Sequence, residues 1–280
     1  MKSPNMTLLR HLTSFLSFTF ITVNLLFWLP LLLLALIIRL LLPIDWIGFW
    51  TVRMIDSVYR MAVKIDAWWF KYILGIQFVI EDEDNVLGRL SKTDSPLIIS
   101  NHRSWFDVFI LQTLISSQGP VLKFLIKTEL LWVPVLGWIC LALNFPRLKR
   151  KGDLSSRRRD LQVARSASIQ LGTTPGALIL FPEGTRFTEP KRVHTRSCYR
   201  SLLNPKPGGF NVIYGALPES TMVIDISIRY LPGEDNCWRC MSGLVDVVHL
   251  KVTGSHAADL GDHLAWLDGC WSKKDQWLNS

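Results

Sequence analysis

The chain has 280 residues, which is enough for one sizeable domain with an appendage, and apolar residues make up 49% of it. This apolar content, together with 12 tryptophans, is too high for an ordinary soluble domain and favours attachment to a membrane. The net charge of +8 predicts an anionic partner, and a phospholipid surface or a lipid phosphate fits this composition better than nucleic acid does.

The first predicted element is an uncharged segment from Leu12 to Ile38. Its length is sufficient to cross a hydrocarbon core about 30 Å thick. Pro30 interrupts the segment, so a kinked single span and a re-entrant hairpin bent at Pro30 both fit the pattern. We therefore expect residues 1–43 to be embedded in the membrane in one of these two arrangements.

Residues 44–75 have the pattern of an amphipathic helix. Apolar side chains recur every three or four residues, and basic side chains occupy another face. A stripe with tryptophans opposite a basic face is typical of a helix that lies in the headgroup layer, and a helix packed on the domain core is the alternative. The stripe consists of Ile47, Trp50, Met54, Val58, Met61, Ile65, Trp68 and Tyr72.

The remaining residues, 76–280, read as one α/β domain. Short apolar runs predict strands, and longer periodic stretches predict helices between them. The predicted strands are residues 76–80, 97–99, 121–126, 177–180, 222–230 and 244–252, and the predicted helices include one opening near Ser104, one at 153–171 and one from 258 onward.

A possible catalytic pair follows the second of these strands, in residues 101–107. His102 and Asp107 are five residues apart, so they would not share a face of one helix and can meet only if the chain turns between them. The carboxylate would then orient the imidazole, whose other nitrogen could accept a proton. The alternative is structural, because Ser104 and Asp107 also fit a capping box that opens a helix.

A second polar stretch, Phe181-Pro182-Glu183-Gly184-Thr185-Arg186, follows the strand predicted at 177–180. Loops at the carboxyl ends of strands in an α/β sheet open onto the same edge, where such sheets bind ligands. We therefore expect this stretch to lie beside His102 and to complete one site.

In this order, the two stretches resemble the motifs of the glycerolipid acyltransferase family that acylates lysophosphatidic acid. The Asn-His-Arg-Ser-Trp run and residues 205–210 look closest to the branch that contains lysocardiolipin acyltransferase. The resemblance covers residues 76–275 and implies a mixed sheet flanked by helices, preceded here by the membrane segment and the amphipathic helix.

The resemblance also implies roles for individual residues. His102 would be the general base, with Asp107 supporting its protonated form. The thioester donor, acyl-CoA or acyl carrier protein, is already activated, so the reaction needs no acyl-enzyme. The donor is a substrate, and we expect no separate cofactor. The substrate-binding residues implied are Arg147, Glu183, Gly184, Thr185, Arg186 and Lys206, with the arginines on the acceptor's phosphate and Glu183 orienting Arg186 or binding a glycerol hydroxyl.

Two compositional features complete the prediction. The basic run from Arg147 to Arg165 lacks interleaved aromatics for base stacking, so we expect it to face lipid headgroups or the phosphates of coenzyme A. The five cysteines are scattered and odd in number, which indicates free thiols in a reducing compartment. Cys237 and Cys240 form a lone pair, so no metal site is predicted.

The sequence therefore predicts a membrane-bound enzyme that acylates 1-acyl-glycerol-3-phosphate to phosphatidic acid, with its catalytic domain facing the cytoplasm. A bacterial inner membrane is expected rather than the endoplasmic reticulum. A different lysophospholipid acceptor, such as lysocardiolipin or lysophosphatidylglycerol, is the near alternative. Two remoter alternatives are a membrane-anchored hydrolase using Ser104 and a non-catalytic binder of anionic lipid.

Overall fold

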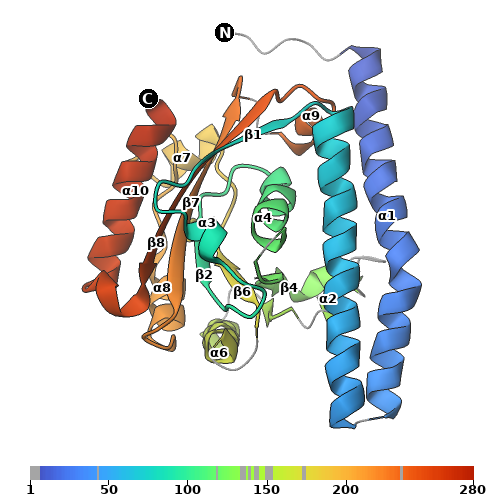
Figure 1. Cartoon of the computed structure of the whole chain (residues 1–280). Coiled ribbons are helices and arrows are strands. Elements are labelled where there is room, and N and C mark those ends of the chain that lie inside the picture. The colour runs from blue at the N-terminus through green and yellow to red at the C-terminus, as the bar shows by residue number, and fades with distance from the viewer. Residues whose placement is uncertain are drawn as a thin grey trace.

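A long helical hairpin stands beside an α/β domain in the computed structural model (Figure 1). The structure describes residues 7–42, 44–117, 119–132, 137, 140–141, 145–148, 154–171, 175–233 and 236–280. The turn region at 133–136 and the basic residues at 149–151 lie outside these ranges.

The hairpin consists of α1 (Leu8–Leu41) and α2 (Asp45–Trp68), which continues into a π-helical turn at Trp69–Ile73. The chain stays helical through Pro30 and reverses direction only after α1 ends, so a hairpin bent at Pro30 is not what forms. With 34 residues and a rise of 1.5 Å each, α1 is about 51 Å long. By length and composition it is able to cross a membrane.

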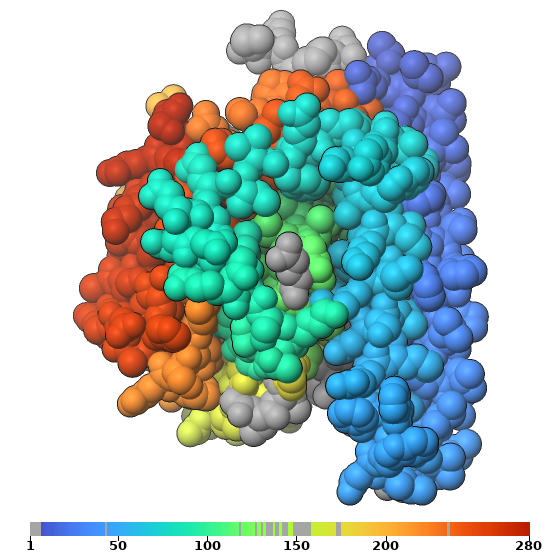
Figure 2. Space-filling model, viewed as in Figure 1, coloured from blue at the N-terminus to red at the C-terminus, as the bar shows by residue number. Residues whose placement is uncertain are grey.

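Polar contacts fasten the first half of α1 to the α/β domain. Arg10 Nη1 donates to the carbonyl oxygen of Gly243 at 2.6 Å, and Ser17 Oγ donates to that of Met241 at 2.9 Å. Both acceptors follow α9 (Cys237–Cys240). The end of the hairpin at which α1 turns into α2 extends beyond the domain, as the space-filling view shows (Figure 2). Large apolar side chains on α1 are exposed along its length, including Leu9, Leu12, Phe15, Leu26, Phe27, Leu31, Leu34 and Leu40.

The helix predicted at 44–75 forms, and one of its faces is buried against the domain while the other is exposed. Ile55, Val58 and Tyr59 are buried in the core, as the alternative interpretation required. Trp46 and Trp50 remain half or more exposed near the hairpin turn. The helix therefore packs on the domain and also presents aromatic side chains to its surroundings.

The central sheet has six strands in the order β1-β8-β7-β2-β6-β3. β8 runs antiparallel to β7, and all the other neighbouring pairs are parallel, so the sheet is mixed. The strands are β1 (Gln77–Glu81), β2 (Leu97–Ser100), β3 (Leu122–Phe124), β6 (Ala177–Leu180), β7 (Met222–Leu231) and β8 (Val247–His256).

One predicted strand is divided in the structure. Residues 121–126 were expected to form a single strand, but β3 ends at Phe124 and a separate short strand β4 (Ile126–Lys127) follows. β4 pairs with β5 (Arg147–Leu148) in a two-stranded sheet of its own. Arg147 is thereby carried away from the main sheet.

Helices cover both faces of the sheet (Figure 1). Because side chains alternate along a strand, Ile98 packs with α2 and α4, whereas Leu97 and Ile99 pack with α6, α8 and α10. The helices and helical turns of the domain are α3 (Val86–Arg89), α4 (Phe106–Ser116), η2 (Thr128–Trp132), α6 (Leu154–Leu171), α7 (Glu189–His194), α8 (Pro207–Tyr214), η3 (Ala257–Leu260) and α10 (His263–Asn279).

The neighbouring strands β7, β2 and β6 are mutually parallel, so their carboxyl ends lie at one edge of the sheet. The loops after β2 and β6 both begin at this edge. The fold therefore brings the two polar stretches of the sequence together, as expected.

A buried ion pair joins α10 to the sheet next to this edge. Lys274 Nζ lies 2.8 Å from Asp225 Oδ1 and donates to the carbonyl oxygen of Ile226 at 2.7 Å. Replacing Lys274 by Met should lower the free energy of unfolding by about 3–5 kcal/mol, because Asp225 would keep an uncompensated buried charge. Denaturant titration in detergent measures the loss.

The double variant Asp225→Asn/Lys274→Met is the matched control, since it removes both charges. It should recover most of the stability. A Lys274→Met protein within 1 kcal/mol of the wild type would contradict the assignment.

Candidate active site

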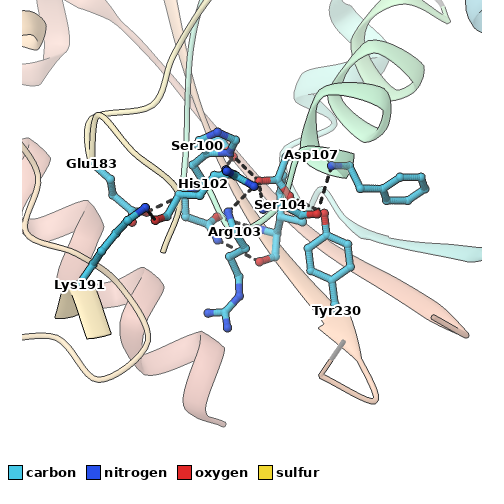
Figure 3. A network of polar contacts seen from close by, with 12 residues as sticks. Ser100, His102, Arg103, Ser104, Asp107, Glu183, Lys191 and Tyr230 are labelled. Carbon is cyan, nitrogen blue, oxygen red and sulfur yellow. Dashed lines mark hydrogen bonds and ion pairs between the residues drawn. The ribbon is translucent and has the colours of Figure 1, made fainter. Parts of the chain in front are cut away.

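The residues after β2 turn back so that His102 meets Asp107 (Figure 3). We call residues 101–105 the His102 loop. His102 Nδ1 lies 2.8 Å from Asp107 Oδ2, and the side chains are 13% and 0% exposed, respectively. The imidazole is therefore accessible, while its carboxylate partner is shielded from water.

Asp107 also organises the start of α4. Its Oδ2 accepts hydrogen bonds from the backbone amides of Arg103 at 2.7 Å and Ser104 at 2.9 Å. Ser104 Oγ in turn accepts from the amide of Phe106 at 3.1 Å. The structural and the catalytic interpretations of this stretch are thus compatible, because one carboxylate both closes the turn and holds the histidine.

Sequence reasoning missed a further partner of this carboxylate. The hydroxyl of Tyr230, at the end of β7, donates to Asp107 Oδ1. Tyr230 is buried, and burial together with the charge of Asp107 raises its pKa well above the usual 10.0. Only the pairing of β7 with β2 reveals this contact, since the two residues are far apart in the sequence.

The second polar stretch, which we call the Glu183 loop (residues 181–188), lies directly against the His102 loop. The amide of Phe187 donates to the carbonyl oxygen of His102 at 2.7 Å. The ring of Phe181 stacks on the imidazole, with centroids 4.1 Å apart. The guanidinium of Arg186 lies 4.8 Å from the centroid of Trp105, so a cation from one loop covers an aromatic from the other.

Glu183 points inward, beneath both loops. Its carboxylate accepts from the amide of His102 at 3.1 Å and from that of Leu203 at 3.3 Å, and the residue is 1% exposed. Glu183 therefore links the backbone of His102 to that of Leu203 in this structure and does not orient Arg186. Burial raises the pKa of Glu183 to about 7, although the two amides and the charges of Lys274 and Arg103 lower it in part.

Gly184 and Lys206 are packed together. Gly184 has φ +69°, which few other residues adopt, and an added Cβ would lie 3.3 Å from Lys206 Nζ. The amide of Lys206 donates to the carbonyl oxygen of Pro182 at 2.8 Å. The side chain of Lys206, which was expected at the acceptor's entrance, therefore packs directly over Gly184.

Thr185 is held by a lysine that the sequence did not suggest. Lys191 Nζ, in α7, donates to Thr185 Oγ1 at 2.8 Å and to the carbonyl oxygen of Arg186 at 2.9 Å. Together with Arg186 and Lys206, it makes the Glu183 loop strongly cationic. Such a surface suits a phosphate or another compact anion.

Arg147 occupies a different place. It is exposed on β5 and lines a cavity of about 500 Å³ against α6, together with Arg159 and Gln162. None of the described residues that line this cavity belongs to the His102 loop or the Glu183 loop. The structure thus brings together every predicted site residue except Arg147.

No cluster of three or more His, Cys, Asp or Glu side chains suited to a metal occurs among the described residues. Cys237 and Cys240 are free thiols.

Comparison with known proteins identifies the family. Residues 83–229, more than half of the chain, match the family described as "Acyltransferase". The chain belongs to the acyltransferase family.

Individual relatives agree with this assignment. The acyltransferase is 26% identical over 208 residues to probable 1-acyl-sn-glycerol-3-phosphate acyltransferase 5 of Arabidopsis thaliana, covering 66% of this chain and 53% of the relative. It is 25% identical over 257 residues to lysocardiolipin acyltransferase 1 of Mus musculus, covering 85% of this chain and 65% of the relative. The match therefore spans between about half and two thirds of these relatives' lengths.

A solved structure confirms the fold class. The crystal structure of the 1-acyl-sn-glycerophosphate acyltransferase PlsC from Thermotoga maritima superposes with a TM-score of 0.59 and 16% identity. The superposition covers 96% of this chain and 94% of that one, so it includes the hairpin as well as the mixed α/β sheet.

The raised pKa of Glu183 predicts a pH-dependent stability. The unfolded chain releases this proton near the usual value of 4.5, whereas the folded protein keeps it to about 7. The wild type should therefore lose stability between these pH values, by up to about 3 kcal/mol, because one pKa unit corresponds to about 1.4 kcal/mol. Glu183→Gln lacks this proton, so its unfolding free energy relative to the wild type should rise over the same range.

Denaturant midpoints of both proteins at several pH values between 4.5 and 8 measure the difference. Glu219→Gln, at an exposed position, serves as the control. A constant difference between Glu183→Gln and the wild type would contradict the assignment.

Proposed function

We propose that this acyltransferase moves a fatty acyl group from acyl-CoA or acyl carrier protein to the free hydroxyl of 1-acyl-glycerol-3-phosphate, giving phosphatidic acid. The observation that carries the proposal is the contact of the His102–Asp107 pair, of which the imidazole is partly exposed, with the cationic Glu183 loop. One half of this arrangement suits proton transfer, and the other suits an anionic lipid head.

His102 acts as the general base. With Nδ1–H bonded to Asp107, Nε2 is the nitrogen available to the acceptor's hydroxyl. As the hydroxyl oxygen attacks the thioester carbonyl, its proton passes to Nε2, and Asp107 stabilises the imidazolium. When the carbon–sulfur bond breaks, the imidazolium returns the proton to the leaving thiolate. General-base assistance of this kind contributes about 10²–10⁴-fold.

Arg186 and Lys206 bind the acceptor's phosphate. Stacking on Trp105 limits the freedom of the Arg186 guanidinium, and its planar fork can bind two phosphate oxygens. Lys191 supports this part of the loop through Thr185 and the Arg186 carbonyl. Arg147, in its separate cavity with Arg159, is assigned to a second anionic group, such as the phosphates of a coenzyme A donor.

The membrane is the source of the acceptor. The N-terminal apolar helix and the family's relatives indicate membrane association, and exposed aromatics near the hairpin turn suit the interfacial region. We place the catalytic domain on the cytoplasmic face, in a bacterial inner membrane.

A second acceptor class has specific support. The relative named lysocardiolipin acyltransferase 1 matches 85% of this chain, so another lysophospholipid is a candidate acceptor. Competition between lysophosphatidic acid and lysocardiolipin for the purified protein distinguishes the two. The hydrolase alternative is disfavoured, because Ser104 is 1% exposed and its hydroxyl oxygen accepts from the Phe106 amide.

Replacing His102 by Ala should reduce acyl transfer by about 10²–10⁴-fold, because the attacking hydroxyl loses its proton acceptor. Release of free thiol from acyl-CoA in the presence of lysophosphatidic acid measures the rate. His256→Ala removes an exposed histidine at the end of β8 and should retain full activity. Turnover by His102→Ala at the wild-type rate would exclude the base assignment.

Replacing Arg186 by Ala should raise the KM for lysophosphatidic acid at least about tenfold, because a hydrogen bond to a charged group contributes about 1.5–3 kcal/mol. The KM for the acyl donor should change much less. Initial rates with each substrate varied in turn give both constants. Arg192→Ala, which breaks an exposed pair with Glu189 on α7, is the matched control. Equal changes in both KM values would argue against the phosphate assignment.

A further inference from the structure

We propose that Tyr230 is a positioning residue for the His102–Asp107 pair: its buried hydroxyl fixes the carboxylate that orients the base. This inference rests on the proposed function and deepens it. Tyr230 lies one residue beyond the segment that matches the acyltransferase family, and none of the sequence motifs includes it.

The argument begins with the two oxygens of Asp107, which are bonded differently (Figure 3). Oδ2 is within hydrogen-bond distance of three nitrogens, those of the imidazole and of the Arg103 and Ser104 amides. The partner of Oδ1 among the described residues is the Tyr230 hydroxyl. Since Asp107 is fully buried, bulk solvent does not reach Oδ1 while the phenol is in place.

The end of β7 is held against the His102 loop at two points. The side chain of Asn101 donates to the Ile228 carbonyl oxygen at 3.0 Å and accepts from the Ile228 amide at 2.8 Å. The backbone pairing of β2 with β7 ends at Ser100 and Ile226. The side chain of Asn101 extends this connection one step further along the two strands. Tyr230, two residues further along β7, then reaches across to α4. Strand, loop and helix are therefore tied together at the carboxylate.

The surroundings keep the phenol in its donor form. Burial is the main cause that raises the pKa of Tyr230, and the charge of Asp107 adds to it. Cys240 and Cys237 of α9 are the next titratable neighbours. Burial raises the pKa of Cys237 to about 11, so its thiol is neutral where the enzyme works. Glu183 accepts a hydrogen bond from the His102 amide, and the charge of Arg103 in the His102 loop also acts on it.

Two consequences follow from losing the hydroxyl. The carboxylate would keep its contacts at Oδ2 but lose the contact at Oδ1 that also opposes rotation about its Cβ–Cγ bond, so Nε2 would be held less firmly toward the acceptor. Without the hydrogen bond from the phenol, the negative charge of the carboxylate would also be less neutralised, so it would stabilise the imidazolium more strongly. The base would then remain protonated at higher pH, and activity would be lost there.

The first test is Tyr230→Phe, which removes the hydroxyl and keeps the ring. We expect kcat to fall about 10- to 100-fold, the range that loss of a hydrogen bond to a charged group gives, with little change in the KM for lysophosphatidic acid. The acidic limb of the pH profile of kcat/KM should move to higher pH. Lost packing alone would lower stability without moving that limb.

Tyr59→Phe is the matched control. Tyr59 is also buried, and its hydroxyl lies 3.4 Å from the Leu122 carbonyl oxygen, away from the site. The Tyr59→Phe protein should keep the wild-type kcat, and the acidic limb of its pH profile should stay at the wild-type position. Because the pKa of Glu183 is raised to about 7, its titration could contribute to the same limb. Persistence of the Tyr230→Phe shift in a Glu183→Gln background assigns it to the His102–Asp107 pair, and its disappearance there overturns the inference.

A double-mutant cycle tests whether Tyr230 acts through Asp107. Once Asp107→Asn has been introduced, adding Tyr230→Phe should cost less than about twofold in kcat; independent, multiplicative losses would overturn the inference. A wild-type rate and pH profile for Tyr230→Phe would also overturn it while leaving the proposed function intact. Absence of transfer by the wild type to any lysophospholipid would instead overturn the proposed function, and this inference with it.

Discussion

The carboxylate of Asp107 is the interaction centre on which the rest of the site depends. A fully buried negative charge is costly unless donors surround it, and here an imidazole, two backbone amides and a phenol do so. The two amides shape the turn into α4, the imidazole is the group that we propose as the general base, and the phenol connects both to the sheet. Because the charge needs all of these donors, the geometry of the His102 loop is linked to the stability of the domain.

The Glu183 loop connects the His102 loop to the last helix through a series of buried contacts. Glu183 connects the backbone of His102 to that of Leu203, and the Leu203 carbonyl oxygen accepts from Trp271 Nε1 of α10 at 3.1 Å. α10 is in turn fastened to β7 by Lys274. A continuous set of buried contacts therefore runs from the last helix to the base. It explains why a site on two loops can be rigid, while the cationic side chains of the Glu183 loop remain near the surface.

The helical hairpin presents one set of side chains to the domain and another set to its surroundings. Its polar contacts, such as Arg10 with Gly243, and part of its apolar side chains face the domain, whereas many other large apolar side chains of α1 are exposed. An enzyme that acts on a lipid needs both properties, because it must bind a membrane without burying its catalytic loops in it. The structure presents large exposed apolar side chains on α1 and α2 and cationic side chains around Arg186.

Local pattern alone predicted most of the elements: the apolar segment, the amphipathic helix and the strand positions follow from side-chain periodicity. The spacing of His102 and Asp107 also predicted that the two side chains meet across a turn. Only the tertiary structure decided which distant residues share a site. The order of β7, β2 and β6 brought Tyr230 to Asp107, turned Glu183 inward and left Arg147 in another cavity, while packing kept α1 helical through Pro30. The physical reason is that strand pairing and burial are long-range interactions, which the neighbours of a residue in sequence do not encode.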